Sequence, residues 1–242
     1  MTPGLYVLGT PIGNLGDITL RGLETLRAAD LVLAEDTRRT QNLLAHHGIR
    51  VPMLSCHKFN EASRTALVLD KIRTGTTVAL VTDSGMPGVS DPGARMVAAC
   101  REAGFPVTVL PGPSAVTAAV ALSGFHGGGF VFEGFLPRKS GARRRRLTEL
   151  AGLSLAVVLF EAPYRLTRLL SELAEIFGDC KVLIARELTK KFEECLVGTP
   201  TELADRLATR SIKGEITVVI APSRSAPEPP SADAPEESEG PS

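Results

Sequence analysis

The segment Val81–Gly93, VTDSGMPGVSDPG, has the composition of a loop that holds a ligand with its backbone. It follows the apolar run TVAL, is bracketed by Asp83 and Asp91, and its last nine residues contain three glycines and two prolines. Glycine lets the backbone approach a ligand closely, and proline stiffens a loop. The glycine spacing fits neither a dinucleotide-binding turn nor a phosphate loop. The segment therefore predicts a binding loop, and its ligand must be inferred from the rest of the chain.

Three further loops follow apolar runs in the same way: Gly9–Asp17 (GTPIGNLGD), Glu35–Thr40 (EDTRRT) and Pro111–Ala115 (PGPSA). Ligands of open α/β sheets bind beyond the carboxyl ends of the strands, so we expect the four loops to meet at one edge. The alternative is that they are ordinary tight turns. Pro11 has no N–H to donate, which makes the first loop a poor cradle for a pyrophosphate.

A basic run, RKSGARRRR, occupies Arg138–Arg146 and holds six cations in nine residues. Such a run is typical either of a surface that grips a polyanion or of a solvated face. Pro137 and Gly141 interrupt regular structure, so we expect the cationic side chains to fan outward from a loop.

The composition is that of an ordinary globular protein, with 242 residues, 43% of them hydrophobic and 22% charged. The four cysteines are far apart and form no C-x-x-C, and the four histidines lack partners at metal-ligand spacing. We therefore expect no disulfide framework and no metal. No apolar stretch approaches the ~20 residues of a membrane span, and a soluble, cytoplasmic protein is predicted.

Short β-branched runs alternate with amphipathic segments along the chain, which predicts an α/β fold with largely parallel sheets. A glycine-rich break near residue 122 divides four strands from five. We expect an N-terminal α/β domain over 1–121, a C-terminal α/β domain over 122–222, and a ligand cleft between them. Residues 223–242 are acidic and rich in Pro and Ser, which predicts a disordered tail. The nine predicted strands are 5–8, 30–35, 77–82, 107–111, 131–135, 155–160, 181–186, 194–198 and 215–221.

Eight motifs follow one another along the chain: GTPIGNLGDIT, AEDTRRT, DSGMPGVSDPG, PGPSA, FEGFLPRK, FEAPYR, RELTKKFEE and KGEITVVI. Together they resemble the tetrapyrrole methylase superfamily, and within it the branch that methylates the ribose 2′-oxygen of a cytidine in small-subunit ribosomal RNA. The resemblance implies two α/β domains, a homodimer, and S-adenosylmethionine as the methyl donor in the interdomain cleft. It also implies small-subunit ribosomal RNA, within an assembled or partly assembled 30S subunit, as the substrate.

The resemblance also implies which residues contact the cofactor. The turn in the opening segment supplies a first group, and other strand-end loops line the same pocket. Met86 replaces an aspartate of the porphyrin and corrin enzymes, which weakens the tetrapyrrole interpretation. The implied cofactor contacts are Pro11, Ser84, Gly85, Met86, Val89, Ser114, Ala115, Phe160, Leu188 and Gly214.

Methyl transfer to a ribose hydroxyl benefits from a base, and a carboxylate just past a strand end is a suitable candidate. Asp36 and Glu187 are the predicted catalytic residues, although acids at such positions are often helix caps or ion-pair partners. His57 and Asn60 are predicted to contact the nucleotide. Arg138, Lys139, Arg143, Arg144, Arg145 and Arg146 are predicted to bind RNA.

Two other functions fit parts of the sequence. One is a tetrapyrrole methyltransferase with the same cofactor, and the other is an RNA-binding module of the ribosome without catalysis. The basic run favours RNA over a macrocycle, and the strand-end loops suited to a methyl donor favour an enzyme over a passive binder.

Overall fold

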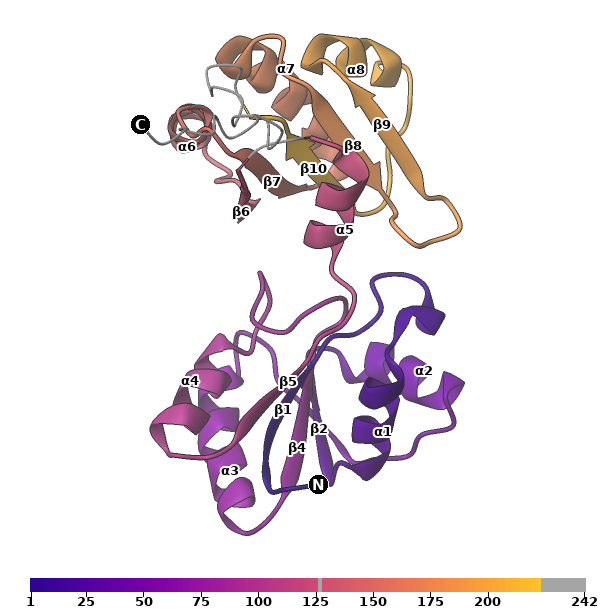
Figure 1. Ribbon diagram of the computed structural model, residues 1–242, viewed down its shortest axis with the longest axis vertical. Helices are drawn as coiled ribbons and strands as arrows, with labels where there is room; N and C mark the ends of the chain where they lie inside the picture. The colour runs from indigo at the N-terminus through magenta and orange to yellow at the C-terminus, as the bar shows by residue number, and fades with distance from the viewer. Residues whose placement is uncertain (126–127, 223–242) are drawn as a thin grey trace, which may run out of the picture. The chain divides into compact units, whose positions relative to one another are not determined.

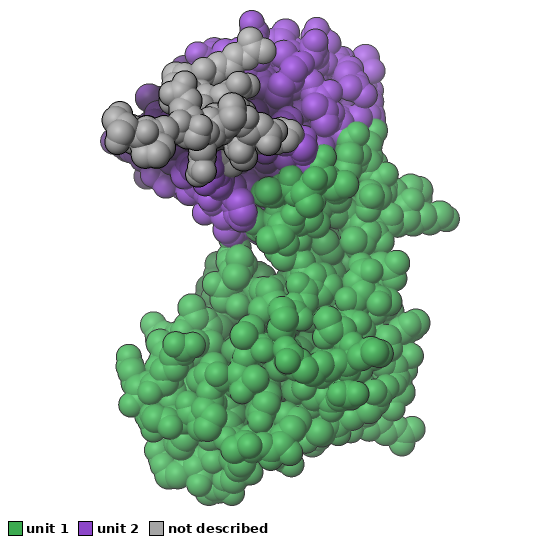
Figure 2. Space-filling view, in the orientation of Figure 1, with its two compact units in different colours: residues 1–122, 185–195, 214–217 green, residues 123–184, 196–213, 218–242 purple. Residues whose placement is uncertain are grey.

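The computed structural model describes residues 1–125 and 128–222. The expected disordered tail, residues 223–242, lies outside the described residues, as does His126. The chain forms two compact units, coloured separately in Figure 2. The first contains residues 1–122, and the second begins at residue 123. Two later segments, 185–195 and 214–217, group with the first unit rather than the second. One reason is that Thr189 Oγ1 accepts a hydrogen bond from Asn14 N (3.1 Å), in the first loop of the chain.

The first unit is built on a five-stranded sheet in the order β3-β2-β4-β1-β5. All four strand pairs in this sheet are parallel, so the carboxyl ends of the strands share one edge. The residues of β2 and β4 are buried throughout, as expected for parallel strands covered on both faces. The strands are β1 (Gly4–Leu8), β2 (Leu31–Ala34), β3 (Met53–Ser55), β4 (Thr77–Val81) and β5 (Val107–Leu110).

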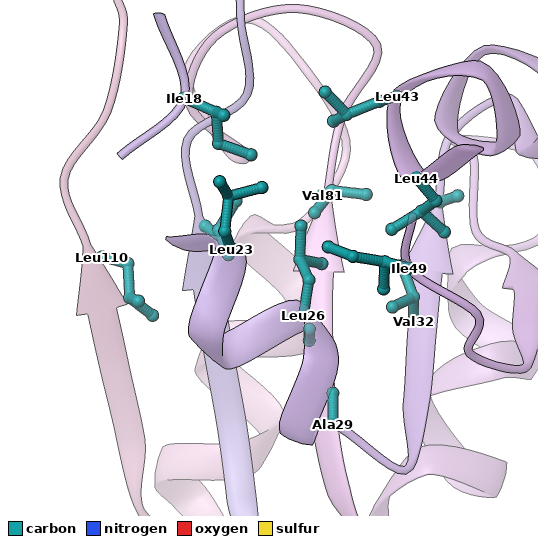
Figure 3. Packing of buried hydrophobic residues seen from close by; sticks show 13 residues of the cluster. Ile18, Leu23, Leu26, Ala29, Val32, Leu43, Leu44, Ile49, Val81 and Leu110 are labelled. Carbon is teal, nitrogen blue, oxygen red and sulfur yellow. The ribbon is translucent and has the colours of Figure 1, made fainter. Parts of the chain in front are cut away.

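Helices cover both faces of this sheet and form two separate cores (Figure 1). On one face, Leu23 and Leu26 of α1 (Leu20–Ala28) pack with Leu43 and Leu44 of α2 (Thr37–His46) against the strands (Figure 3). The other core joins buried side chains of two more helices, α3 (Glu61–Arg73) and α4 (Ala94–Glu102). The short helix η1 (Leu15–Asp17) precedes α1, and α5 (Ala115–Ser123) follows β5.

The second sheet has the strand order β6-β7-β10-β8-β9. β6 and β7 are parallel, with an irregularity between Phe132 and Gly134 that leaves Glu133 out of the register. The helices are α6 (Ser140–Ala151), the short helix η2 (Pro163–Arg165), α7 (Leu166–Phe177) and α8 (Pro200–Leu207). The strands are β6 (Phe130–Phe135), β7 (Ala156–Glu161), β8 (Val182–Arg186), β9 (Glu194–Gly198) and β10 (Ile216–Ile220).

The α/β fold with two sheets confirms the fold class that the sequence predicts. Each of the nine predicted strands is present, and the one strand that the sequence analysis missed is β3. It has only three half-buried residues and follows Pro52, so it has too little alternation or apolar length to be recognised. No helix in the described ranges is long and apolar enough to cross a membrane.

Candidate functional site

The four predicted loops meet at the carboxyl edge of the first sheet. Thr10 and Gly85 exchange backbone hydrogen bonds of 2.9 and 3.1 Å, which join the loop after β1 to the loop after β4. The loop after β2 is attached through Asp83, whose Oδ1 accepts a hydrogen bond from Asp36 N (2.9 Å). Gly9 N donates to Leu110 O (3.2 Å) at the end of β5. The loops are therefore parts of one surface and not independent turns.

Glycine is required where these loops approach each other most closely. A Cβ built on Gly9 would lie 2.8 Å from Gly112 Cα and 2.6 Å from Met86 Sδ. A Cβ on Gly112 would lie 2.7 Å from Gly9 O. Distances this short are not tolerated between non-bonded atoms, so any larger residue would push the loops apart. Gly85 has a different requirement, because its φ of +81° is a conformation that favours glycine.

A cavity of about 260 Å³ opens beside these loops, with all its lining residues in the first unit. Pro11 and Ser84, two of the implied cofactor contacts, line it. Its wall carries both signs of charge, from Arg39 and Lys190 and from two carboxylates. The lining residues are Thr10, Pro11, Ile12, Gly13, Leu15, Arg39, Thr40, Asn42, Leu43, Thr82, Asp83, Ser84, Lys190 and Glu215.

Other implied cofactor contacts lie next to this cavity or apart from it. Gly85 and Met86 belong to the joined loops, and Ser114 with Ala115 begins α5 directly after Pro113, whose carbonyl approaches Gly85. Val89 is 43% exposed on the loop after β4. Leu188 and Gly214 are in the two returning segments of the first unit. Phe160 is in the second unit, on β7, half-buried between Phe132 and Phe135.

Asp36, predicted as a catalytic base, serves as the N-cap of α2. Its Oδ1 accepts hydrogen bonds from Arg38 N (2.9 Å) and Arg38 Nε (3.1 Å), and its Oδ2 accepts one from the Arg38 guanidinium (2.7 Å). These bonds lower the pKa of Asp36 to about 2. A carboxylate with so low a pKa is a weak base. Its contacts favour the helix-capping role over the catalytic one.

Glu187, the second predicted base, holds the two returning segments together. Its Oε1 accepts hydrogen bonds from Glu215 N (2.8 Å) and Lys190 Nζ (2.9 Å), and its side chain lies over Gly214, where a Cβ would clash at 2.5 Å. Burial tends to raise the pKa of Glu187, but the hydrogen bonds from Glu215 and Lys190 outweigh it and lower the pKa. Its backbone φ of +51° belongs to the same tight turn. These contacts favour a structural role.

A row of ionisable groups lies at the same sheet edge, and this arrangement was not predicted from the sequence. Glu35 follows β2, Asp83 follows β4 and His57 follows β3, and these three strands are neighbours. Asp91, in the loop after β4, is close enough for the charges of Glu35 and Asp83 to act on it. We call Glu35, Asp83 and Asp91 the carboxylate row. Its sequence signal is that one acid follows each of two central strands.

Burial, together with the charges of neighbouring carboxylates, raises the pKa of Glu35 and the pKa of Asp91. Burial first, and then the charges of Glu35 and Asp83, raise the pKa of Asp91 to about 6. Burial also raises the pKa of Glu35, against a hydrogen bond from Asp83 N. The Nδ1 atom of His57 is buried and has no hydrogen-bond partner among the described residues. Perturbed groups of this kind are concentrated at functional sites.

We predict that Asp91→Asn stabilises the protein more at pH 8 than at pH 4. The folded-state pKa of Asp91 lies above the unfolded value, so ionisation costs folded-state stability as the pH rises from ~4 through ~6. The asparagine removes this cost. Because Asp91 is only half-buried and solvent screens its interactions, the gain in free energy of unfolding should be larger at pH 8 by about 1 kcal/mol. Urea unfolding at both pH values measures it. The control is Asp205→Asn, because Asp205 is an exposed acid in α8. An equal effect of Asp91→Asn at both pH values would contradict the prediction.

His57 and Asn60, predicted to contact the nucleotide, are in the loop between β3 and α3. The Asn60 side chain is occupied within this loop, because its Oδ1 accepts from His57 N (2.8 Å) and its Nδ2 donates to Ser55 O (3.3 Å). Asn60 thus shapes the loop. The neighbouring Phe59 is 86% exposed, with Lys58 Nζ 5.0 Å from its ring centroid.

The expectation that Arg143–Arg146 fan outward from a loop is wrong, because α6 begins at Ser140 and includes all four arginines. Arg143 is only 3% exposed, and its guanidinium donates to both carboxylate oxygens of Glu172 (2.6 and 2.7 Å). Arg143 therefore belongs to the core of the second unit and is not available to RNA. Its signal in the sequence is the spacing to Leu147 and Leu150, which places the three on one helix face.

Two more arginines of the run are paired with acids. Arg144 contacts Glu175 (2.6 Å), and Arg146 donates two hydrogen bonds to Glu133 (2.8 and 2.6 Å) and one to Glu149 (2.8 Å). Arg138, Lys139 and Arg145 are exposed and form no ion pair within the part of the chain that the structure describes. With respect to the described residues, the basic run thus has three unpaired cations, which we call the free cations, and two of them precede the helix.

We predict that Arg143→Ala lowers the free energy of unfolding by about 3–5 kcal/mol, because it leaves Glu172 buried with an uncompensated charge. Arg168 Nε, 3.4 Å from Glu172, reduces this cost only in part. The combined change Arg143→Met with Glu172→Leu should recover most of the loss, since it removes both charges. Arg145→Ala, two residues along the helix, is the matched control and should change stability by less than about 0.5 kcal/mol. Chemical denaturation measures all three, and equal stability of the two alanine variants would refute the prediction.

Among residues 1–125 and 128–222, no group of three His, Cys, Asp or Glu side chains is placed to hold a metal ion.

Both units are of the α/β class, and the first has a charged cavity at the carboxyl edge of its parallel sheet. The family model for tetrapyrrole (corrin/porphyrin) methylases matches residues 4–204. The ribosomal RNA small subunit methyltransferase I of Thermotoga maritima is 48% identical over 216 residues, covering 89% of this chain and 97% of its own length. The protein of the same name from Xylella fastidiosa is 45% identical, covering 90% and 82%. The chain therefore belongs to the tetrapyrrole methylase family, and within it to the group of ribosomal RNA small subunit methyltransferases I.

A solved structure supports the fold. Uroporphyrin-III C-methyltransferase from Thermus thermophilus, solved in complex with S-adenosyl homocysteine, aligns with a TM-score of 0.64 at 19% identity. The alignment covers 90% of this chain and 97% of that one. At this identity the likeness concerns the fold alone.

Proposed function

We propose that the protein transfers a methyl group from S-adenosylmethionine to the ribose 2′-oxygen of a cytidine in small-subunit ribosomal RNA. The observation that carries the proposal is the joining of four strand-end loops, three of them rich in glycine and proline, beside a charged cavity, in a chain 48% identical to a ribosomal RNA small subunit methyltransferase I. We place this activity in the cytoplasm, on an assembled or partly assembled 30S subunit. We also propose that the chain acts as a homodimer, as the family resemblance implies.

The residues at the cavity fit a zwitterionic donor of this kind. Arg39 pairs with Asp83 (3.5 Å) and Lys190 pairs with Glu215 (2.8 Å), so the wall presents groups of both charges with little net charge. The Gly85 turn adds bare backbone. The cavity of about 260 Å³ is slightly smaller than the ~300–1,000 Å³ typical of sites that enclose a small molecule. It would therefore hold part of the donor, with Ser84–Met86 and Ser114–Ala115 as further contacts. When bound, the donor supplies a methyl group on a positively charged sulfur that leaves as a neutral thioether.

The acceptor hydroxyl must lose its proton as the new oxygen–carbon bond forms. Within the carboxylate row, Asp91 is better suited to accept that proton than Asp36 or Glu187, each of which already accepts at least two hydrogen bonds. Asp91 has a pKa of about 6, close to the value that suits a general base near neutral pH. We therefore transfer the proposed base from the two predicted acids to this row, with Asp91 as the first candidate.

Mass spectrometry of small-subunit RNA from cells with and without the gene tests the proposed function. We expect one ribose-methylated cytidine to disappear when the gene is removed and to return with the purified enzyme and S-adenosylmethionine. A matched assay with uroporphyrinogen as the acceptor tests the tetrapyrrole alternative. Unchanged RNA together with methylation of the macrocycle would overturn the proposal.

We predict that Gly85→Leu abolishes binding of S-adenosylmethionine. A leucine at a φ of +81° strains the turn and places a side chain between the loop and the ligand, although Ile12 and Pro113 leave room for a Cβ at 3.7 Å. Gly104→Leu is the matched control, because Gly104 has a φ of +73° with open space around it and lies beyond α4. Calorimetry measures both variants after circular dichroism has established that they fold. Wild-type affinity in a folded Gly85→Leu protein would remove this turn from the site.

We predict that the free cations, and not the paired ones, set the salt dependence of RNA binding. Each phosphate contact releases counterions, so Arg138→Ser with Lys139→Ser should reduce the slope of log affinity against log salt by up to about two. Arg144→Ser with Arg146→Ser removes as much charge from side chains already paired with acids, and it should change the slope less. Filter binding over a salt series compares the two variants. Equal slopes would contradict this division of the basic run.

A further inference from the structure

We propose that Phe135 and Tyr164 form a stacking platform for two unpaired nucleobases, with Arg138 and Lys139 holding the adjoining phosphates. This inference deepens the proposed function, because it assumes an RNA substrate and specifies that the recognised segment is single-stranded. All four residues belong to the second unit.

Phe135 is a large apolar side chain that is exposed to solvent. It ends β6, an edge strand of the second sheet, and is 60% exposed. Its ring centroid is 5.7 Å from that of Phe160, which in turn is 5.0 Å from the ring of Phe132. Ring contacts of this kind fix the orientation of an aromatic side chain. Phe135 is thus held by the ring of Phe160, which the ring of Phe132 contacts in turn, while most of the Phe135 surface remains accessible.

Tyr164 is more exposed still, at 83%, and it is in the short helix η2 between β7 and α7. The next residue, Arg165, ties this turn to the loop that follows Phe135. Its guanidinium donates to Leu136 O (3.1 Å), and it pairs with the buried Glu161 at the end of β7 (3.1 Å). Phe135 is in register with Phe160 on the neighbouring strand. These contacts bring the two loops together at the carboxyl edge of the sheet.

The charge around these rings is positive. Arg138 and Lys139 are exposed and follow Phe135 by three and four residues, with no ion pair inside the described ranges. The nearby acids are already committed, because Glu161 pairs with Arg165 and Glu133 pairs with Arg146. Exposed aromatic rings beside free cations are the arrangement by which proteins bind single strands, with bases on the rings and phosphates on the cations. A purely apolar protein partner would leave the two cations without a counter-charge.

The intrinsic fluorescence of the protein provides a direct test. The chain has no tryptophan and only two tyrosines, Tyr6 and Tyr164. In a Tyr6→Phe variant, all tyrosine emission therefore comes from Tyr164. We expect a ten-nucleotide oligocytidylate to quench this emission on binding, because a stacked base contacts the ring. An abasic ribose-phosphate oligomer of equal length should bind through its phosphates and leave the emission unchanged. Oligocytidylate that binds without quenching would overturn the platform.

Substitutions test the energetic role of the rings. Phe135→Leu and Tyr164→Leu should each weaken binding of oligocytidylate by about 5- to 150-fold. Phe135→Tyr and Tyr164→Phe, which keep the rings, should retain affinity near that of the parent. Phe105→Leu is the control, because Phe105 precedes β5 at the opposite sheet edge of the other unit and also has an arginine near its ring. Equal losses in the leucine and ring-retaining variants, or no loss in either, would refute the proposal.

The outcomes also separate this inference from the proposed function. If the parent protein methylates small-subunit RNA while Tyr164→Leu and Phe135→Leu bind and methylate normally, the platform is wrong and the function stands. If the parent binds oligocytidylate with quenching but methylates no RNA, the platform stands and the proposed function fails. A protein partner that competes with no RNA and itself quenches Tyr164 would overturn the choice of occupant.

Discussion

The loops after β1, β4 and β5 are in close backbone contact, and the structure of the carboxyl edge of the first sheet depends on that contact. Gly9 and Gly112 lie so close that neither can carry a Cβ, and Thr10 and Gly85 exchange two hydrogen bonds across the same junction. Because the strands are parallel, their loops share an edge, and glycine allows those loops to merge into one surface. The cavity beside them takes its wall from backbone and from a few charged side chains. Its shape therefore depends on residues whose main property is the absence of a side chain.

The same edge carries two kinds of carboxylate. Some accept hydrogen bonds that stabilise the fold, and Asp91 is instead available to accept a proton. Asp36 and Glu187 accept several hydrogen bonds each, and their lowered pKa values record that the ionised form is already stabilised. Asp91 has the opposite balance, because burial and the charges of Glu35 and Asp83 oppose its ionisation. Because ionisation of Asp91 costs free energy in the folded protein, uptake of a proton by its carboxylate is favoured. The distinction between the two kinds of acid lies in their partners and not in their distance from a strand end.

The fold class and most elements are predictable from the sequence, because apolar runs and amphipathic periods are local properties. The strand β3 was missed since three half-buried residues carry too little periodic information. The pairing of side chains is harder to predict. Arg143 belongs to a run of like residues, yet a partner 29 positions away makes it a core residue. Asp36 and Asp91 both follow strands, and only the three-dimensional contacts distinguish a helix cap from a destabilised acid. Composition identifies which residues carry charge, whereas the fold decides which of those charges are already neutralised.

In the second unit, this neutralisation distinguishes the paired arginines of α6 from the unpaired cations of the loop that precedes it. Three arginines of α6 pair with acids of other elements: Glu172 and Glu175 of α7, and Glu133 of β6. These ion pairs attach α6 to the rest of the unit. In the loop ahead of the helix, Arg138 and Lys139 form no ion pair with any residue that the structure describes, and they follow the exposed Phe135 by three and four residues. A loop at a strand end has fewer neighbours than a packed helix, so its side chains stay unpaired without leaving buried groups unsatisfied. An RNA strand would meet the free cations first, and the rings beside them would then distinguish an unpaired segment from a duplex, whose bases are already stacked on one another.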